Sequence, residues 1–363
     1  MKILHITPDI YEGGVATLVY EMSRYQVSRN HSVTIFCTVT SKNQKSRESY
    51  FTDIGVEVVY CHYKNPYDPR IIFAVRRLLK DYDLIHVHLF PNQFFVRIAN
   101  LFASKTKRFL ITTEHNTWNN RRKHAILRFF DRWLYNGYDK IVCISNPTEF
   151  NLRKWLGGKY RTSEKIRTIT NGVNLKKYSL FDDIHKEDKI IIMVSRLENP
   201  KDPLTLVKAI SKCDSDVKVI FVGSGPMEKD IRVEAKKLEI EHRVHLLGNR
   251  TDVPELLAKA SIGVLSTNWD GFGLVAVEYM AAGLPVLASN VDGLRDVVGD
   301  NESLFPVGDE NTLSAKIISL LQDKSFYIEK SRYFKNRSLL FSIEKMNKEY
   351  LDLYQNIFLQ IPD

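Results

Sequence analysis

The chain has 363 residues, of which 44% are hydrophobic and 26% charged, a balance typical of globular rather than disordered proteins. This length exceeds what one ordinary core needs and predicts two domains of roughly 150 residues each. The four cysteines follow no metal-binding or redox spacing, which argues against a disulfide framework and indicates reduced residues in a cytosolic protein.

The net charge of +9 is unevenly distributed. Residues 1–180 contain 29 Lys and Arg against 14 Asp and Glu, whereas residues 181–363 contain 23 against 29. The first half is therefore expected to face an anionic partner: a membrane surface, a phosphorylated lipid acceptor or nucleic acid. The N-terminal apolar run is short and has no cleavage-like site, so it predicts a strand and not a secretion signal.

Short apolar runs rich in β-branched residues alternate with helical stretches, which predicts parallel sheets with crossover helices. In the first half the predicted strands are 2–7, 33–38, 56–61, 84–88, 108–113, 140–144 and 166–169. In the second half they are 189–194, 217–222, 243–247, 262–266 and 285–289. Helical periodicity is clear at 204–213, 253–260 and 342–358.

The polar stretch 178–189 separates these two sets of strands and predicts the domain boundary. The first domain is expected over residues 1–175, closed by a crossover helix at 342–363, and the second over 187–340. The apolar stretch 272–289 contains Glu278, Gly283 and Pro285, so it predicts a buried helix and strand and not a membrane span.

The densest motif follows the strand at 262–266 and leads into a helix. Gly271 and Gly273 allow close approach of a ligand to the backbone, and free N–H groups at a helix start favour an anion. Glu278, about two turns further on, can accept hydrogen bonds from ribose hydroxyls. The alternative is an ordinary helix start with Asp270 as its cap, which a glycine loop alone favours equally.

A second motif follows the strand at 189–194. Arg196 and Lys201 leave the carboxyl edge of the predicted sheet, where open α/β sheets bind ligands. Arg can bind phosphate oxygens with two N–H groups and Lys acts as a point charge, so together they can neutralise a diphosphate. Taken singly, each residue is better interpreted as a solvated surface charge.

Together these motifs resemble the retaining glycosyltransferases of the GT-B fold, family four, also called glycosyl transferases group 1. The resemblance covers nearly the whole chain. It implies an α/β fold with two Rossmann-like, doubly wound domains facing a cleft, the first for the acceptor and the second for a nucleotide-sugar donor. Arg196 and Lys201 match the residues that bind the donor phosphates in this family.

The family's Glu-x7-Glu signature matches Asp270 and Glu278, with Asp in place of the usual first Glu, so the carboxylate reaches less far by one methylene. The resemblance also implies backbone contacts to the donor from Phe272, Gly273, Leu274 and Val275.

The first half adds a glycine loop and a strand-end histidine that match the family. Gly13 and Gly14 lie between the first strand and the first helix and are expected near the donor phosphate; the alternative is a tight turn. The loop lacks the Gly-x-Gly-x-x-Gly spacing of a dinucleotide site. His115 is expected beside the transferred sugar, although a strand-end histidine alone is more often structural. His86 and His88 are interpreted as mainly structural.

The resemblance implies a metal-independent, retaining hexosyltransferase with His115, Asp270, Arg196 and Lys201 as catalytic residues. The donor is a nucleotide diphosphate sugar, with uridine favoured over guanosine, and it is a co-substrate, so no cofactor and no metal are expected. The acceptor is a glycan or a lipid-linked sugar, as in the synthesis of bacterial capsule or lipopolysaccharide. A sugar-nucleotide epimerase of the same fold is the alternative. Nucleic-acid binding is not expected, because no recognised module is present.

Residues 121–133 are the most basic and aromatic segment. On one helix, Arg121, Arg128 and Arg132 would share a face, and the apolar residues, Ile126, Phe129, Phe130 and Trp133, would share another. Such a helix either docks on anionic lipid or packs on the core with a solvated basic face. The excess charge of this half favours a cytoplasmic protein that is peripheral on the inner face of the cell membrane.

Overall fold

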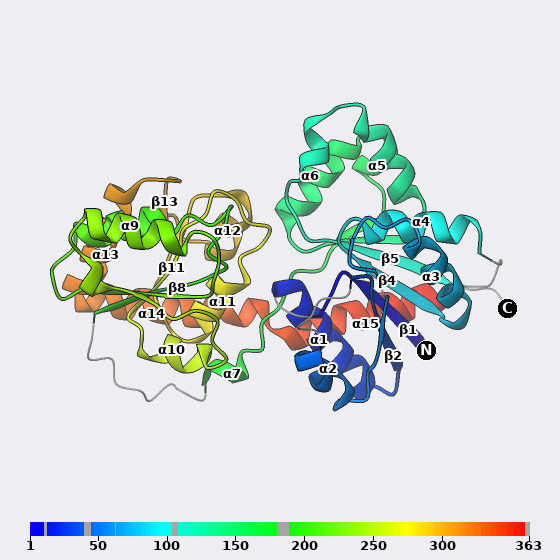
Figure 1. The fold of residues 1–363 in the computed structure, drawn as a ribbon, viewed down its shortest axis with the longest axis horizontal. Helices are drawn as coiled ribbons and strands as arrows, with labels where there is room; N and C mark the ends of the chain where they lie inside the picture. Colours follow the sequence, from blue (N-terminus) through cyan, green and yellow to red (C-terminus); the bar gives the residue numbers. More distant parts are fainter. Residues whose placement is uncertain (11–12, 40–44, 62, 104–107, 180–188, 360–363) are drawn as a thin grey trace. The chain divides into compact units, whose positions relative to one another are not determined.

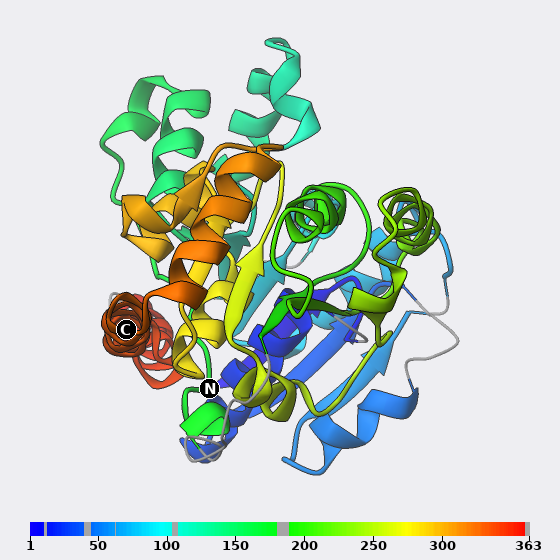
Figure 2. The same cartoon turned by 90° about the vertical axis from the view of Figure 1, so that its left-hand side faces the viewer.

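The computed structural model describes residues 1–10, 13–39, 45–61, 63–103, 108–179 and 189–359. The chain divides into two compact units. Unit 1 comprises Met1–Asn171 and Glu344–Asp363, and unit 2 comprises Gly172–Ile343. Each unit is a parallel sheet with helices on both faces (Figures 1 and 2).

Unit 1 contains a seven-stranded sheet in the order β3-β2-β1-β4-β5-β6-β7, and all its pairings are parallel. The strands are β1 Lys2–Thr7, β2 Ser32–Cys37, β3 Glu57–Tyr60, β4 Leu84–His88, β5 Phe109–Glu114, β6 Lys140–Cys143 and β7 Ile166–Thr168. Its helices are α1 Gly14–Ser28, α2 Lys45–Thr52, α3 Ile71–Leu78, α4 Asn92–Leu101, α5 Leu127–Asn136, α6 Asn146–Leu156 and α15 Ile343–Leu359.

Unit 2 contains a six-stranded parallel sheet in the order β10-β9-β8-β11-β12-β13. The strands are β8 Ile190–Val194, β9 Lys218–Val222, β10 Val244–Leu246, β11 Ile262–Leu265, β12 Val286–Ser289 and β13 Leu304–Phe305. The helices are α7 Lys176–Ser179, α8 Pro203–Ser211, α9 Glu228–Lys237, α10 Val253–Lys259, α11 Leu274–Ala281, α12 Asp292–Val298, α13 Glu310–Gln322 and α14 Lys324–Ser338.

The prediction of two doubly wound parallel sheets is confirmed, and every predicted strand is present within one or two residues of its expected bounds. Of the strands that the structure describes, only β13 was missed, because a two-residue strand is too short to show periodicity. The stretch 272–289 forms α11 and β12, as predicted. Among the helices that the structure describes, none combines the length and apolar character needed to cross a bilayer.

The predicted boundary at 178–189 lies largely outside the described residues, since 180–188 are not described. The units divide earlier, at Asn171 and Gly172. Within unit 2, the Val173 N–H donates to the Phe341 carbonyl at 2.8 Å, and a Cβ on Gly172 would lie 2.6 Å from the Ser342 carbonyl oxygen. Glycine is therefore required here because the start and the end of unit 2 run in direct backbone contact.

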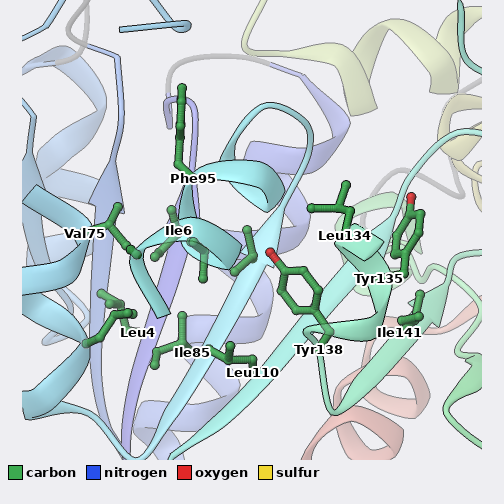
Figure 3. Packing of buried hydrophobic residues seen from close by; sticks show 14 of the residues in the cluster. Leu4, Ile6, Val75, Ile85, Phe95, Leu110, Leu134, Tyr135, Tyr138 and Ile141 are labelled. Atoms are coloured by element: carbon green, nitrogen blue, oxygen red, sulfur yellow. The ribbon is translucent and has the colours of Figure 1, made fainter. Parts of the chain in front are cut away.

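The two faces of the unit 1 sheet differ in chemistry. One face buries an apolar cluster that includes Leu4, Ile6, Ile85 and Val87, under α3, α4, α5 and α6 (Figure 3). Residues on the alternate positions of the same strands, His5, His86 and His88, face α1 and α15 instead. Unit 1 therefore has an apolar core on one side of its sheet, and on the other side a layer in which these histidines are buried among apolar residues such as Ile3, Ile35 and Ile111.

Helix α15 completes this polar layer. The Tyr354 hydroxyl lies 2.6 Å from His86 Nδ1, and the Tyr350 hydroxyl lies 3.2 Å from Thr113 Oγ1. Asn347 donates to the Glu21 carbonyl on α1 at 3.2 Å, so α15 packs beside α1. Buried imidazole and hydroxyl groups need such partners, because an unpaired polar group in the interior is costly. The helix is therefore anchored by polar contacts as well as by apolar packing.

The prediction of one continuous helix over 121–133 is wrong. Asn120–Lys123 forms a separate 3-10 turn, and α5 begins only at Leu127. Arg121 pairs with the buried Asp131 at 3.1 Å, and Arg122 donates to the Thr117 carbonyl at 2.8 Å. These contacts hold the turn away from the axis of α5, so the arginines do not form a single solvated face.

Tyr354→Phe removes the hydroxyl that lies against His86 and should lower the stability of the protein by roughly 1–3 kcal/mol. The measurement is the unfolding transition by scanning calorimetry. Tyr333→Phe is the matched control, because its hydroxyl contacts the Gly299 carbonyl at the exposed surface and its loss should cost within about 0.5 kcal/mol. Equal unfolding temperatures for wild type and Tyr354→Phe would contradict the role of Tyr354 in anchoring α15.

Candidate functional site

Both sheets place several of the predicted site residues at their topological switch points. In unit 2 the strand order reverses between β8 and β11, and in unit 1 between β1 and β4. Ligands of open α/β sheets bind beyond the carboxyl ends of the strands at such points, because the flanking loops part there. Arg196 and Asp270 follow β8 and β11, and Gly13 follows β1, so the topology agrees with the sequence prediction.

Lys201 and Asp270 are brought together in unit 2. Lys201 Nζ lies 2.6 Å from Asp270 Oδ2, with side chains that are 20% and 16% exposed. The other carboxylate oxygen of Asp270 accepts the N–H of Phe272 at 3.0 Å. Two backbone hydrogen bonds, Asn268 N–H to the Pro200 carbonyl and Asp202 N–H to the Ser266 carbonyl, join the same two loops. Asp270 therefore positions Lys201 as well as the start of α11.

Arg196 forms a different ion pair from that of Lys201 and Asp270. Its guanidinium pairs with Glu198, two residues on, and its side chain is 74% exposed. Surface pairs of this kind contribute little to stability. The side chain is therefore available to an incoming anion, whereas Lys201 is already engaged by a carboxylate.

The start of α11 is fixed by a glycine. Gly273 has φ +83°, a conformation that other residues rarely adopt, and a Cβ there would lie 2.1 Å from Leu294. The neighbouring Phe272 side chain is buried and packs edge-on against Phe341. Phe272, Gly273, Leu274 and Val275 thus form the start of this helix, where the dipole and the N–H groups favour an anion.

Glu278 lies on α11, half-buried, in contact with Tyr178 of α7. Burial raises the pKa of Glu278 to about 7, while Lys177 and the hydrogen bond with Tyr178 act in the opposite direction. The carboxyl group is thus partly protonated near neutral pH. Tyr178 is a site residue that sequence reasoning missed, since its contact with Glu278 joins positions a hundred residues apart.

Tyr279 is a second missed residue. The Val194 N–H at the end of β8 donates to its hydroxyl at 2.7 Å, and its ring packs over Gly263, where a Cβ would lie 2.4 Å from the ring. Tyr279 therefore fixes α11 against the end of β8. The sequence held a weak signal for it, an isolated glycine within the β11 strand.

In unit 1, Gly13 and His115 lie beyond the ends of β1 and β5. Gly13 has φ +110° directly before α1, and both Gly13 and Gly14 are exposed. His115 is half-buried, and its Nε2 lies 3.3 Å from Nδ1 of the buried His88. Burial lowers the pKa of His115 to about 4, so its imidazole is neutral at pH 7.

His5, His86 and His88 have ring nitrogens within 4.8 Å of one another, which makes them a candidate metal grouping among the described residues. Each of their six ring nitrogens already lies within hydrogen-bond distance of a protein partner: Gln26, Thr113, Tyr354, His115 or another histidine of the group. A metal ion would have to displace these partners, so the group fits a hydrogen-bonded layer better than a metal centre.

Comparison with known proteins agrees with this architecture. Anabaena HepE, in its complex with UDP and glucose, superimposes with a TM-score of 0.83 at 20% identity, covering 98% of this chain and 99% of HepE. Two parallel-sheet α/β domains of this kind define the GT-B class of glycosyltransferases.

The family described as Glycosyltransferase Family 4 matches residues 12–177, and the one described as Glycosyl transferases group 1 matches residues 179–339. The chain therefore belongs to the group 1, family 4 glycosyltransferases.

Two curated relatives are similar over most of the chain. N-acetyl-alpha-D-glucosaminyl L-malate synthase of Bacillus anthracis is 25% identical over 95% of this chain and 94% of its own length. UDP-Gal:alpha-D-GlcNAc-diphosphoundecaprenol alpha-1,3-galactosyltransferase of Escherichia coli is 24% identical over 80% of this chain and 81% of its own length. The second is a galactosyltransferase by its name.

The raised pKa of Glu278 predicts a pH-dependent stability. A carboxyl whose folded-state pKa lies above its ordinary value binds its proton more tightly when folded, so its contribution is full below about pH 4.5 and is lost as pH rises through about 7. Raising the pH from 5 to 8 should therefore lower the melting temperature of wild type more than that of Glu278→Gln. Glu255→Gln, at an exposed position on α10, is the control and should follow wild type. If the melting temperatures of wild type and Glu278→Gln change equally with pH, the raised pKa of Glu278 is contradicted.

Proposed function

We propose that this glycosyltransferase transfers a hexose from a UDP-sugar to a glycan or lipid-linked acceptor, with retention of the anomeric configuration and without a metal ion. The observation that carries the proposal is the Lys201–Asp270 pair beside the start of α11, at the switch point of unit 2. This arrangement combines a fixed cation with helix N–H groups, as the binding of a diphosphate requires.

In this mechanism Lys201 and Arg196 stabilise the leaving diphosphate, which develops charge as the glycosidic bond breaks. Lys201 exchanges the carboxylate of Asp270 for phosphate oxygens, and Arg196 leaves Glu198 to bind in the same way. Asp270, relieved of the ammonium group, is then available to the hydroxyls of the donor sugar. Glu278 accepts hydrogen bonds from the ribose, which its ionised form does best.

Retention follows if the acceptor attacks the same face from which the diphosphate departs. The leaving phosphate oxygen then takes the acceptor proton, so no pair of carboxylates of the kind that glycosidases use is needed. His115 contacts the transferred sugar as a neutral imidazole, a state that its lowered pKa supports. Gly13, directly before α1, and Gly14, its first residue, are exposed and leave room for the phosphates.

The relatives support uridine as the base and a lipid-linked acceptor. HepE binds UDP and glucose, and the Escherichia coli relative takes UDP-Gal to a diphosphoundecaprenol-linked sugar. We extend these two features to this chain and place it in the synthesis of bacterial surface polysaccharides.

The alternative function, a sugar-nucleotide epimerase, has no observation in its favour beyond the shared fold.

Lys201→Ala and Arg196→Ala should each weaken transition-state stabilisation by roughly 2–4 kcal/mol. The assay is the release of UDP from UDP-sugars, after a thermal-shift screen of UDP- and GDP-sugars has identified the donor. Arg250→Ala is the matched control, because Arg250 also pairs with an acidic residue two positions on, Asp252, at the surface of unit 2. Near-wild-type turnover in Lys201→Ala or Arg196→Ala would refute the donor site.

We further propose that unit 1 docks on an anionic membrane from the cytoplasmic side. Ile126 and Phe129, at the start of α5, are 75% and 69% exposed, and Trp133 and Trp118 are also exposed. Lys123 lies over the Trp118 ring at 5.2 Å. Exposed aromatic and aliphatic side chains with cations nearby suit the headgroup region of a bilayer. The positive excess of residues 1–180 adds attraction to anionic lipid.

Phe129→Ser should reduce binding to vesicles of anionic phospholipid at low salt by roughly ten- to a hundredfold, because one buried aromatic side chain is worth about 1.5–3 kcal/mol. Co-sedimentation measures the bound fraction. Ile328→Ser, which removes an exposed apolar residue from α14 of unit 2, should leave binding unchanged. Equal binding by wild type and Phe129→Ser would remove the docking proposal and leave the donor site untouched.

A further inference from the structure

Four side chains of unit 1 form a continuous hydrogen-bonded row from the interior to His115. Gln26 Oε1 lies 2.9 Å from His5 Nε2, and His5 Nδ1 lies 3.2 Å from His88 Nε2. His88 Nδ1 then lies 3.3 Å from His115 Nε2. Gln26, His5 and His88 are almost fully buried and come from α1, β1 and β4. The row therefore uses both ring nitrogens of His5 and of His88 and one of His115.

The imidazoles of this row are neutral at pH 7. Burial lowers the pKa of His5 to about 4, against the opposing hydrogen bond with Gln26, and it lowers the pKa of His115 to about 4. Burial, with the neighbouring His86, His5 and His115, lowers the pKa of His88 well below its ordinary value. Geometry supports the same state, because a protonated histidine would present two N–H groups and face a neighbour's N–H.

In a row of neutral imidazoles, all hydrogen bonds must be donated in the same direction along the row. Each neutral ring carries one N–H and one acceptor nitrogen, so the proton position in one ring fixes it in the next. The end of the row decides the direction. Because a carboxamide oxygen can only accept, His5 donates from Nε2 to Gln26, and His5 Nδ1 must accept from His88 Nε2. His88 Nδ1 then accepts from His115 Nε2.

The Gln26 amide is itself oriented by a second partner. Burial raises the pKa of Tyr354 well above its ordinary value, and a hydrogen bond with Gln26 acts in the opposite direction, as an amide N–H donated to the phenolic oxygen does. With the NH₂ group toward Tyr354, the amide oxygen faces His5. The Tyr354 hydroxyl can then donate to His86 Nδ1, 2.6 Å away.

We propose that Gln26 and His5 are positioning residues, which act through His88 to hold His115 as the tautomer protonated on Nε2, with Nδ1 as a hydrogen-bond acceptor. The row itself stands on the geometry of unit 1, and only its purpose rests on the proposed function. In that function, a fixed acceptor at Nδ1 selects a sugar hydroxyl as its donor. The opposite tautomer would present an N–H there and would select a sugar oxygen as an acceptor instead.

The test is the tautomeric state of His115, read from long-range ¹H–¹⁵N correlation spectra of the ligand-free protein labelled with ¹⁵N-histidine. His115→Gln identifies the His115 signals. We expect wild type at pH 7 to carry the proton on Nε2 of His5, His88 and His115. Gln26→Met replaces the amide by an apolar side chain of similar length, so the preference for Nε2 at His115 should fall about fivefold, the effect of one lost hydrogen bond.

Ser23→Ala is the matched control, because Ser23 lies on the buried face of the same helix and its hydroxyl has no hydrogen-bond partner among the residues that the structure describes. This variant should keep the wild-type tautomers. The proposal is overturned if wild-type His115 carries its proton on Nδ1, or if Gln26→Met leaves its tautomers unchanged. It is also overturned if stoichiometric zinc chloride shifts the signals of His5, His86 and His88 together, since the three would then be ligands. If Gln26→Met does not fold, the wild-type spectrum still decides the direction of the row.

Calorimetric titration with UDP separates this proposal from the proposed function. Gln26→Met should bind UDP as tightly as wild type, because Arg196, Lys201 and Glu278, the side chains assigned to the UDP moiety, lie in unit 2. Failure of wild type to bind UDP, with the predicted tautomers present, would count against the UDP donor and leave the histidine row in place.

Discussion

All strands of each sheet run in the same direction, and the chemistry of both units depends on this constraint. Parallel strands deliver their carboxyl ends to one edge, and the switch point separates the loops that follow them. In unit 2 this brings residues 69 positions apart, Lys201 and Asp270, to 2.6 Å. The backbone bonds between the same loops, together with Tyr279 under the end of β8, make that meeting point rigid.

Unit 1 uses its sheet differently. Its apolar face is an ordinary core, whereas its other face buries histidines, threonine and tyrosine hydroxyls in one connected layer. Burying so many polar groups is tolerated because most of them find a partner, and a hydrogen-bonded network of this kind specifies a single arrangement of its members. The layer reaches His115 at the edge of the sheet, so order in the interior is transmitted to the edge residue through direct contacts.

The sequence predicted the sheets well because buried parallel strands are short, apolar and β-branched, and these properties are local. The glycines before α11 and the charged residues after β8 could be found for the same reason. Contacts between residues far apart in the sequence could not be predicted. Gln26, His5 and His88 are separated by 21 and 83 positions, and nothing in the neighbourhood of Gln26 distinguishes it from a surface glutamine.

At 121–133 the local pattern itself gave a wrong prediction of secondary structure. Its apolar spacing is helical, but Asp131 lies buried and binds Arg121 from a separate turn, so tertiary contacts decide the local structure.

Which residues bind the donor and its sugar remains a prediction. The residues assigned to these roles are Arg196, Lys201, Asp270, Glu278 and His115.

The position of α15 has a consequence for the order in which the protein is made. Unit 2 is one continuous stretch of chain, but unit 1 needs residues from both ends of the sequence. While the ribosome is still translating unit 2, His86 and Thr113 are present without Tyr354 and Tyr350, and this side of the sheet is covered by α1 without α15. Unit 1 therefore begins before unit 2 but is completed after it, and the nascent chain carries an incompletely covered polar surface until α15 emerges.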